Sequence, residues 1–125
     1  MKIENFKIRL EEFGIVPLEE EEPLLFTMLQ SAKRYLLARI GQEELPEGAE
    51  DVVLTMAAGE YLLWRNSKGD LEGFDTEPVI RQISQGDTSI TYGVGNDHLP
   101  PVEELAKRLL NPPEAVINQW RRFRW

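Results

Sequence analysis

The chain has 125 residues, of which 42% are hydrophobic and 29% are charged, and it carries a formal net charge of −8 with no cysteine. This length fits a single domain spanning residues 1–125 and leaves no room for a second full core. The absence of cysteine excludes disulfides, thiolate nucleophiles and cysteine-ligated metals, and the acidic charge disfavours tight binding to nucleic acid because it repels phosphate.

The first predicted helix covers about residues 3–13. Apolar residues recur there at spacings of three and four, which places them on one helix face. They are Ile3, Phe6, Leu10 and Phe13. Gly14 follows, and we expect it to end the helix.

A second helix is predicted from Glu22 to Ile40. Pro23 suits its first turn, where a missing N–H is not needed, and Gly41 ends it. The predicted buried stripe consists of Leu25, Met28, Leu29, Ala32, Leu36 and Ile40. Four acidic residues lie at its N-terminus, where they favour the helix dipole: Glu19, Glu20, Glu21 and Glu22. The run is either a solvated cap or a negative patch that faces a channel or a partner.

A third helix is predicted over about residues 50–66. Its apolar face comprises Val52, Val53, Met56, Ala57, Tyr61 and Trp64. The small residues Ala57, Ala58 and Gly59 predict a close helix crossing, which would explain a glycine that costs about 1 kcal/mol of helix propensity. Glu60, beside the apolar face, is either an ordinary boundary residue or one half of a salt bridge between subunits.

A β-hairpin is predicted at about residues 79–92. β-Branched residues flank Gly86 and Asp87, which is the signal of a two-residue hairpin turn, so these two residues are expected at its tip. The predicted inner face of the ribbon consists of Val79, Ile83, Ile90 and Tyr92. The expected fold class is therefore mainly α, a small bundle of three to four helices with one hairpin.

The last predicted helix begins near Val102. Asn111 is expected to cap a further short helix with Pro112 in its first turn. The tail, residues 119–125, is expected to be free to move, and it holds an unusual cluster of arginine and aromatic residues. The cluster is Trp120, Arg121, Arg122, Phe123, Arg124 and Trp125. It is a docking element for a partner, a segment that packs on the chain's own core, or a basic patch for nucleic acid.

Catalytic motifs are missing from the sequence. His98 is the only histidine and has no metal-binding partner at a suitable spacing, and Gly93-Val94-Gly95 lacks the rest of a phosphate-binding motif. We therefore expect no enzyme activity, no cofactor and no metal. No signal peptide and no apolar run of about 20 residues is seen, so we expect a soluble intracellular protein without a membrane partner.

Several segments, taken in order, resemble a known family. They are residues 24–36, Leu45-Pro46-Glu47-Gly48 leading into residues 52–62, residues 83–92, and the closing basic and aromatic residues 121–125. Their order in a chain of this length is similar to that of the head–tail connector (adaptor) proteins of tailed bacteriophages and prophage-like elements. Together they cover most of residues 20–125.

The resemblance implies a structural subunit of a ring of about a dozen copies. The ring would join the portal at the capsid vertex to the tail, with a tail-side stopper or completion protein as a further partner. DNA would cross the channel without tight binding, and the protein would reside in the virion, or in the host cytoplasm before assembly. The alternative is an acidic protein-binding module or regulator that acts as a monomer.

Overall fold

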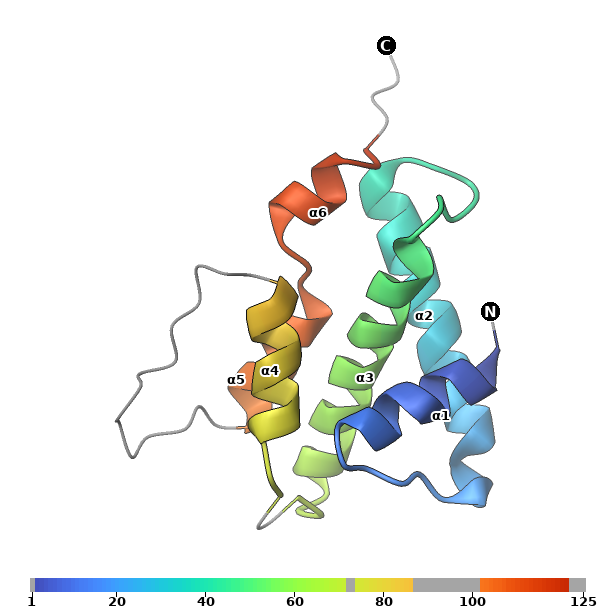
Figure 1. Ribbon diagram of the computed structural model, residues 1–125. Coiled ribbons are helices and arrows are strands. Elements are labelled where there is room, and N and C mark those ends of the chain that lie inside the picture. The colour runs from blue at the N-terminus through green and yellow to red at the C-terminus, as the bar shows by residue number, and fades with distance from the viewer. Residues whose placement is uncertain (1, 72–73, 87–101, 122–125) are drawn as a thin grey trace.

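The computed structural model describes residues 2–71, 74–86 and 102–121, with residues 82–86 described by their backbone alone. Over these residues the protein is a bundle of helices, as the sequence predicted (Figure 1). The elements are α1 (Ile3–Glu12), the 3₁₀ turn η1 (Glu19–Glu21), α2 (Glu22–Ile40), α3 (Ala49–Ser67), α4 (Glu77–Gly86), α5 (Val102–Leu110) and α6 (Glu114–Asn118).

Helix α1 ends where the sequence predicted. Gly14 adopts a φ of +83°, and the N–H of Ile15 donates to the carbonyl of Leu10 over 2.9 Å. This is the hydrogen bond of a Schellman motif, and both Leu10 and Ile15 are buried, as its hydrophobic contact requires. The chain therefore turns sharply towards α2.

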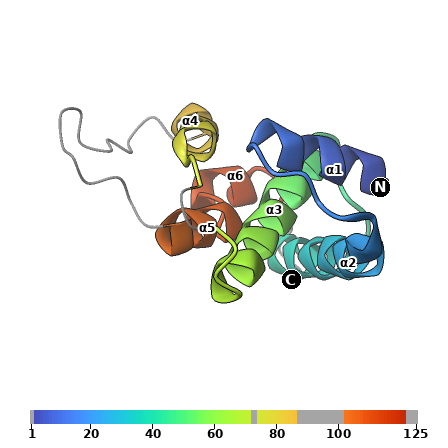
Figure 2. The same cartoon turned by 90° about the horizontal axis from the view of Figure 1, so that it is seen from below.

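Helix α3 lies in the middle of the molecule between α2 and α5, while α1 packs against both α2 and α3 (Figures 1 and 2). All six residues of the predicted α2 stripe are buried. On α3, the predicted face is also buried, except that Val52 and Trp64 are only partly so. Because Ala58, Gly59 and Leu62 are buried too, α3 packs on more than one side.

Gly59 marks the close crossing of α3 and α5, as predicted. A Cβ at this position would lie 2.7 Å from the carbonyl oxygen of Ala106 and 2.8 Å from the Cβ of Leu109. Both distances are shorter than side-chain carbons tolerate, so only glycine lets the two helices approach this closely. The crossing attaches the C-terminal helices to the rest of the bundle.

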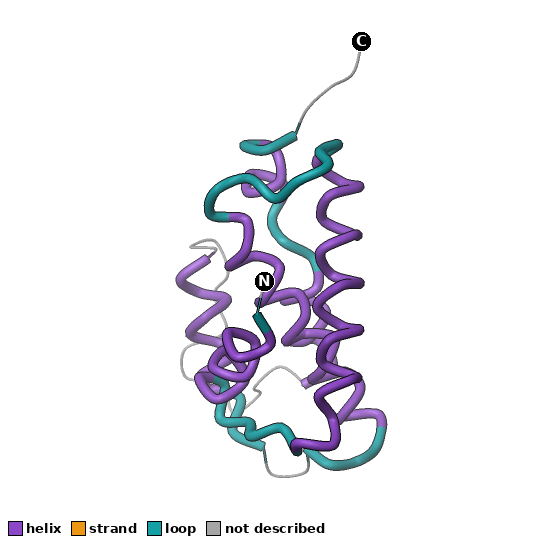
Figure 3. Tube along the Cα trace, turned by 90° about the vertical axis from the view of Figure 1, so that its right-hand side faces the viewer, coloured by secondary structure: helices purple, strands orange, loops and turns teal. Residues whose placement is uncertain are grey.

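The predicted hairpin is wrong. Residues 77–86 form α4, which packs against α5, and Gly86 is its last residue rather than a turn tip (Figure 2). The described residues contain no strand (Figure 3), while the second half of the predicted hairpin lies outside them. The carboxylate of Asp75 accepts the Glu77 N–H over 3.0 Å, and Glu77 pairs with Arg81 one turn later. These contacts stabilise a helix start.

The predicted cap of the last helix is also wrong. The side chain of Asn111 donates to the carbonyl of Lys107 over 2.7 Å, so it caps the end of α5 rather than the start of α6. Helix α6 begins after Pro113, whose fixed φ of −57° precedes the first turn. It packs near the end of α2, where Ile117 is fully buried.

Candidate functional site

The acidic run divides into two halves. The Glu21 carboxylate accepts hydrogen bonds from the Tyr61 hydroxyl and from the Leu18 N–H, each over 2.8 Å, and Glu22 pairs with Lys7. Burial is the main cause that raises the pKa of the Tyr61 hydroxyl to about 12, and the hydrogen bond to Glu21 is the second. Glu19 and Glu20 are exposed. Half of the run therefore binds this chain itself, and only Glu19 and Glu20 face outwards without such contacts.

The root of the tail is attached to the body of the molecule. Trp120 is partly buried against the core, with its ring beside Gly48, and its carbonyl accepts a hydrogen bond from the Gln42 side chain. These contacts join the chain after α6 to the connection between α2 and α3. Trp120 thus packs on the chain's own core, which is one of the three interpretations that the sequence left open for the cluster.

Ion pairs extend this attachment. The two carboxylate oxygens of Glu114 contact different arginines: one pairs with Arg39 on α2, and the other lies 3.2 Å from Arg121. The Arg39 guanidinium in turn lies 6.0 Å from the centre of the Tyr35 ring. Arg121 is therefore attached to α6 and, through Glu114, to the last turn of α2. Figure 1 shows that α6 lies beside this end of α2.

The remaining predicted site residues lie outside the described residues. These are Arg122, Phe123, Arg124 and Trp125 of the tail, Asp87 of the predicted hairpin tip, and His98.

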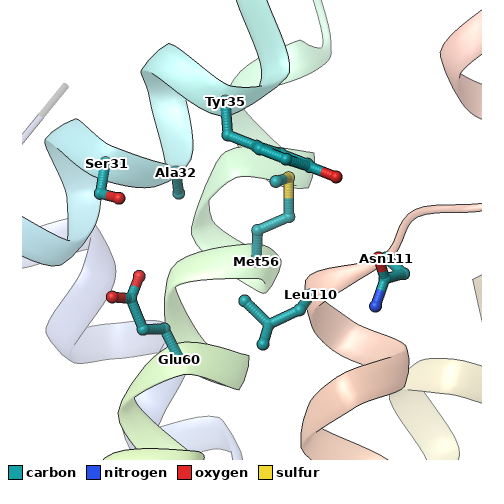
Figure 4. A pocket seen from close by; sticks show the side chains of 7 residues that line it. All are labelled: Ser31, Ala32, Tyr35, Met56, Glu60, Leu110 and Asn111. Atoms are coloured by element: carbon teal, nitrogen blue, oxygen red, sulfur yellow. The ribbon is translucent and has the colours of Figure 1, made fainter. Parts of the chain in front are cut away.

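Glu60 borders a hollow of about 280 Å³ between α2, α3 and the end of α5. Its wall consists of Ser31, Ala32, Tyr35, Met56, Glu60, Leu110 and Asn111. Figure 4 shows the Glu60 carboxylate and the Ser31 hydroxyl on one side, the Tyr35 ring and Asn111 on the other, and Met56 between them. Burial raises the pKa of the Glu60 carboxyl. Among the described residues, it has neither a hydrogen-bond donor nor an ion-pair partner.

Glu60 was selected from the sequence, but the hollow that it borders was not predicted. Ser31 and Tyr35 lie on the outward side of α2, and Leu110 and Asn111 come from a distant part of the chain. Half of Tyr35 is exposed, which is unusual for a large aromatic residue but agrees with its position outside the predicted buried stripe of α2. The hollow forms where Leu110, the last residue of α5, lies near residues of α2 and α3.

Among the described residues, no group of three or more histidine, aspartate or glutamate side chains could hold a metal ion. None of the described helices is both long and apolar enough to cross a membrane.

Comparison with protein-family models, curated proteins and solved structures finds no match to this chain.

Proposed function

We propose that this chain is a structural assembly protein, the subunit of a ring that joins a phage portal to the tail machinery. The observation that carries the proposal is the fixed tail root, in which Trp120 and Arg121 are held by Gln42 and Glu114. The basic and aromatic residues 122–125 follow this root directly in the sequence. Arginine and tryptophan are enriched at interface hot spots, so this segment suits docking on another protein.

Other surface features support binding to proteins. Val16 and Leu18, two residues apart between α1 and η1, are 74% and 59% exposed. Burying such side chains on a partner contributes roughly 25 cal/mol per Å². Glu19 and Glu20 follow at once, so apolar and acidic groups share this surface. In a ring, acidic side chains of this kind would let DNA pass without adhering to the channel.

The resemblance to connector proteins supports the proposal through the helices and the tail. It no longer does so through the segment at 83–92, since residues 83–86 belong to α4. We also propose that the protein is not an enzyme and binds no cofactor, because its sequence lacks catalytic and phosphate-binding motifs.

Removal of residues 122–125 tests the docking role of the tail. The deletion begins after Arg121 because Arg121 contacts Glu114 and its loss would disturb the bundle itself. We expect the melting temperature to stay within about 2 °C, and light scattering to show that the complex with the portal protein is lost.

A second variant provides a matched control. Glu114→Gln weakens the contacts to Arg39 and Arg121 while leaving residues 122–125 in place, so it should lower portal binding less than the deletion does. Unchanged portal binding after the deletion would refute the docking role. A full-length chain that stays monomeric with portal protein present would favour the alternative, a monomeric acidic binding module.

A further inference from the structure

The Glu60 carboxylate borders the hollow and has no hydrogen-bond or ion-pair partner among the described residues. Burial disfavours the charged form, and no cation or N–H group among the described residues compensates for it. A cation that entered the hollow would restore the missing interaction. Glu60 is the only acidic residue of the lining, so a single positive charge would neutralise the hollow.

The walls of the hollow determine which cation fits. Met56, Ala32 and Leu110 form an apolar floor, and the Ser31 hydroxyl lies on the same side as the Glu60 carboxylate (Figure 4). The volume of about 280 Å³ and the opening to solvent suit one long side chain that enters from outside. Such a side chain needs an apolar stem for the floor and a charged end for Glu60.

We propose that this hollow binds an arginine side chain presented by a partner protein, with the guanidinium on Glu60 and the methylene stem over Met56 and Leu110. A guanidinium carries five N–H donors, enough for both carboxylate oxygens and the Ser31 hydroxyl together. A guanidinium is also less strongly hydrated than an ammonium group, so moving it from water onto an apolar floor costs less free energy. The net charge of −8 attracts partners with basic surfaces.

The inference rests on the proposed function only in assuming that the chain binds proteins. The hollow lies midway along α2 and α3, whereas the tail root lies where α2 ends. An assay of the hollow therefore needs neither the portal nor a ring.

A short peptide serves as the probe. Acetyl-Ala-Arg-Ala-amide is titrated into the ¹⁵N-labelled full chain at neutral pH, in parallel with the same peptide carrying citrulline, a neutral analogue of arginine of the same shape. We expect the arginine peptide to shift the amide resonances of residues around Ser31, Met56 and Glu60 and to saturate, with a Kd on the order of 1 mM. The citrulline peptide should bind at least about tenfold more weakly, because it cannot pair with the carboxylate.

Two variants locate the interaction. Glu60→Gln should weaken binding of the arginine peptide at least about tenfold, whereas Glu50→Gln, an exposed acid in the first turn of the same helix, should leave it unchanged. Equal binding of the arginine and citrulline peptides, or equal binding by the Glu60→Gln variant, would overturn the proposal. A lysine peptide that binds as tightly as the arginine peptide would overturn the assignment to arginine.

The chain's own tail is the competing occupant, since residues 122 and 124 are arginines. If the peptide binds only after residues 122–125 are deleted, the tail fills the hollow and the proposal of a partner's arginine is wrong. If binding is the same with and without the deletion, the hollow is free for a partner. Loss of portal binding in the deletion variant with peptide binding retained would separate the two sites. Absence of peptide binding in both the full chain and the deletion variant would overturn the arginine site and leave the proposed function unaffected.

Discussion

Gly59 has no side chain, and this determines how closely two helices of the bundle approach. The backbone of α5 occupies the space that any Cβ on residue 59 would need. Relative to alanine, a glycine inside a helix costs about 1 kcal/mol, and the close packing of α3 on α5 offsets this cost.

Replacement of Gly59 by alanine should therefore destabilise the protein despite the better helix propensity. We expect a loss of about 1–3 kcal/mol in the free energy of unfolding, measured by urea denaturation, because backbone atoms of Ala106 and Leu110 would have to move. Asn66→Ala, at an exposed position of the same helix, is the control and should stay within about 0.5 kcal/mol. A more stable Gly59→Ala variant would contradict the tight crossing.

Glu60, the next residue, affects stability in a pH-dependent way. Burial raises the pKa of its carboxyl, so between the unfolded and folded pKa values the folded protein holds a proton that the unfolded chain has lost. Stability contributed by this residue is therefore highest below the unfolded pKa and is lost as the pH rises through the folded pKa.

Glu60→Gln should consequently stabilise the protein at pH 7, by less than about 1 kcal/mol because the hollow is open to solvent. Below about pH 3 the difference should vanish, since both states then carry a protonated carboxyl. Thermal unfolding of both proteins across this pH range measures the effect, with Glu50→Gln as the control. A variant less stable than the parent at pH 7 would mean that Glu60 has a favourable partner in the folded chain.

At the scale of elements, the glutamates of the turn η1 differ in their contacts: one binds α3 and the others are exposed. Glu21 joins the turn to α3 by accepting the hydroxyl of the buried Tyr61. Glu21→Ala should cost about 1–2 kcal/mol in unfolding free energy, because a buried hydroxyl would lose its charged acceptor. Glu20→Ala, one residue earlier and exposed, should change stability by no more than about 0.5 kcal/mol. Equal losses in both variants would show that the run acts as one cap.

The longer helices could be predicted from the sequence because two signals agreed in each. Apolar spacing gave the buried stripe of α2, and Pro23 and Gly41 marked its ends within the residues observed. Residues 77–86 carried conflicting signals. Val79 and Ile80 are β-branched and favour a strand, but Val79 and Ile83 are also four residues apart, as on a helix. Asp75, Glu77 and Pro78 are typical of a helix start, but the hairpin prediction did not use this signal and relied on the apparent turn at Gly86 and Asp87.

The candidate site was harder to predict than the helices. Glu60 could be selected because it lies in the helical pattern beside an apolar face. Leu110 and Asn111 reach the same hollow through the packing of α5, which depends on tertiary contacts that no local pattern contains. The contact between Glu21 and Tyr61 likewise joins residues that are 40 positions apart in the sequence.

For the whole molecule, the acidic charge determines how the protein behaves towards DNA. With a net charge of −8, the isolated chain should bind duplex DNA weakly or not at all at about 0.15 M salt. A fluorescence titration measures this, and a parallel titration at low salt shows any contribution of the tail arginines. A submicromolar Kd at about 0.15 M salt would contradict the prediction, because such affinity requires several phosphate contacts.

The crossing at Gly59 also has a consequence for the order in which the protein folds. The contact joins residues 59 and 106, which are far apart in the sequence, whereas α2 ends at Ile40 and α3 begins soon afterwards at Ala49. Closing a long loop costs more conformational entropy than closing a short one, so α2 and α3 should assemble before α5 docks. Native-state hydrogen exchange should then show α5 and α6 opening more readily than α2 and α3. Equal protection of all these helices would show that the bundle opens as a single cooperative unit.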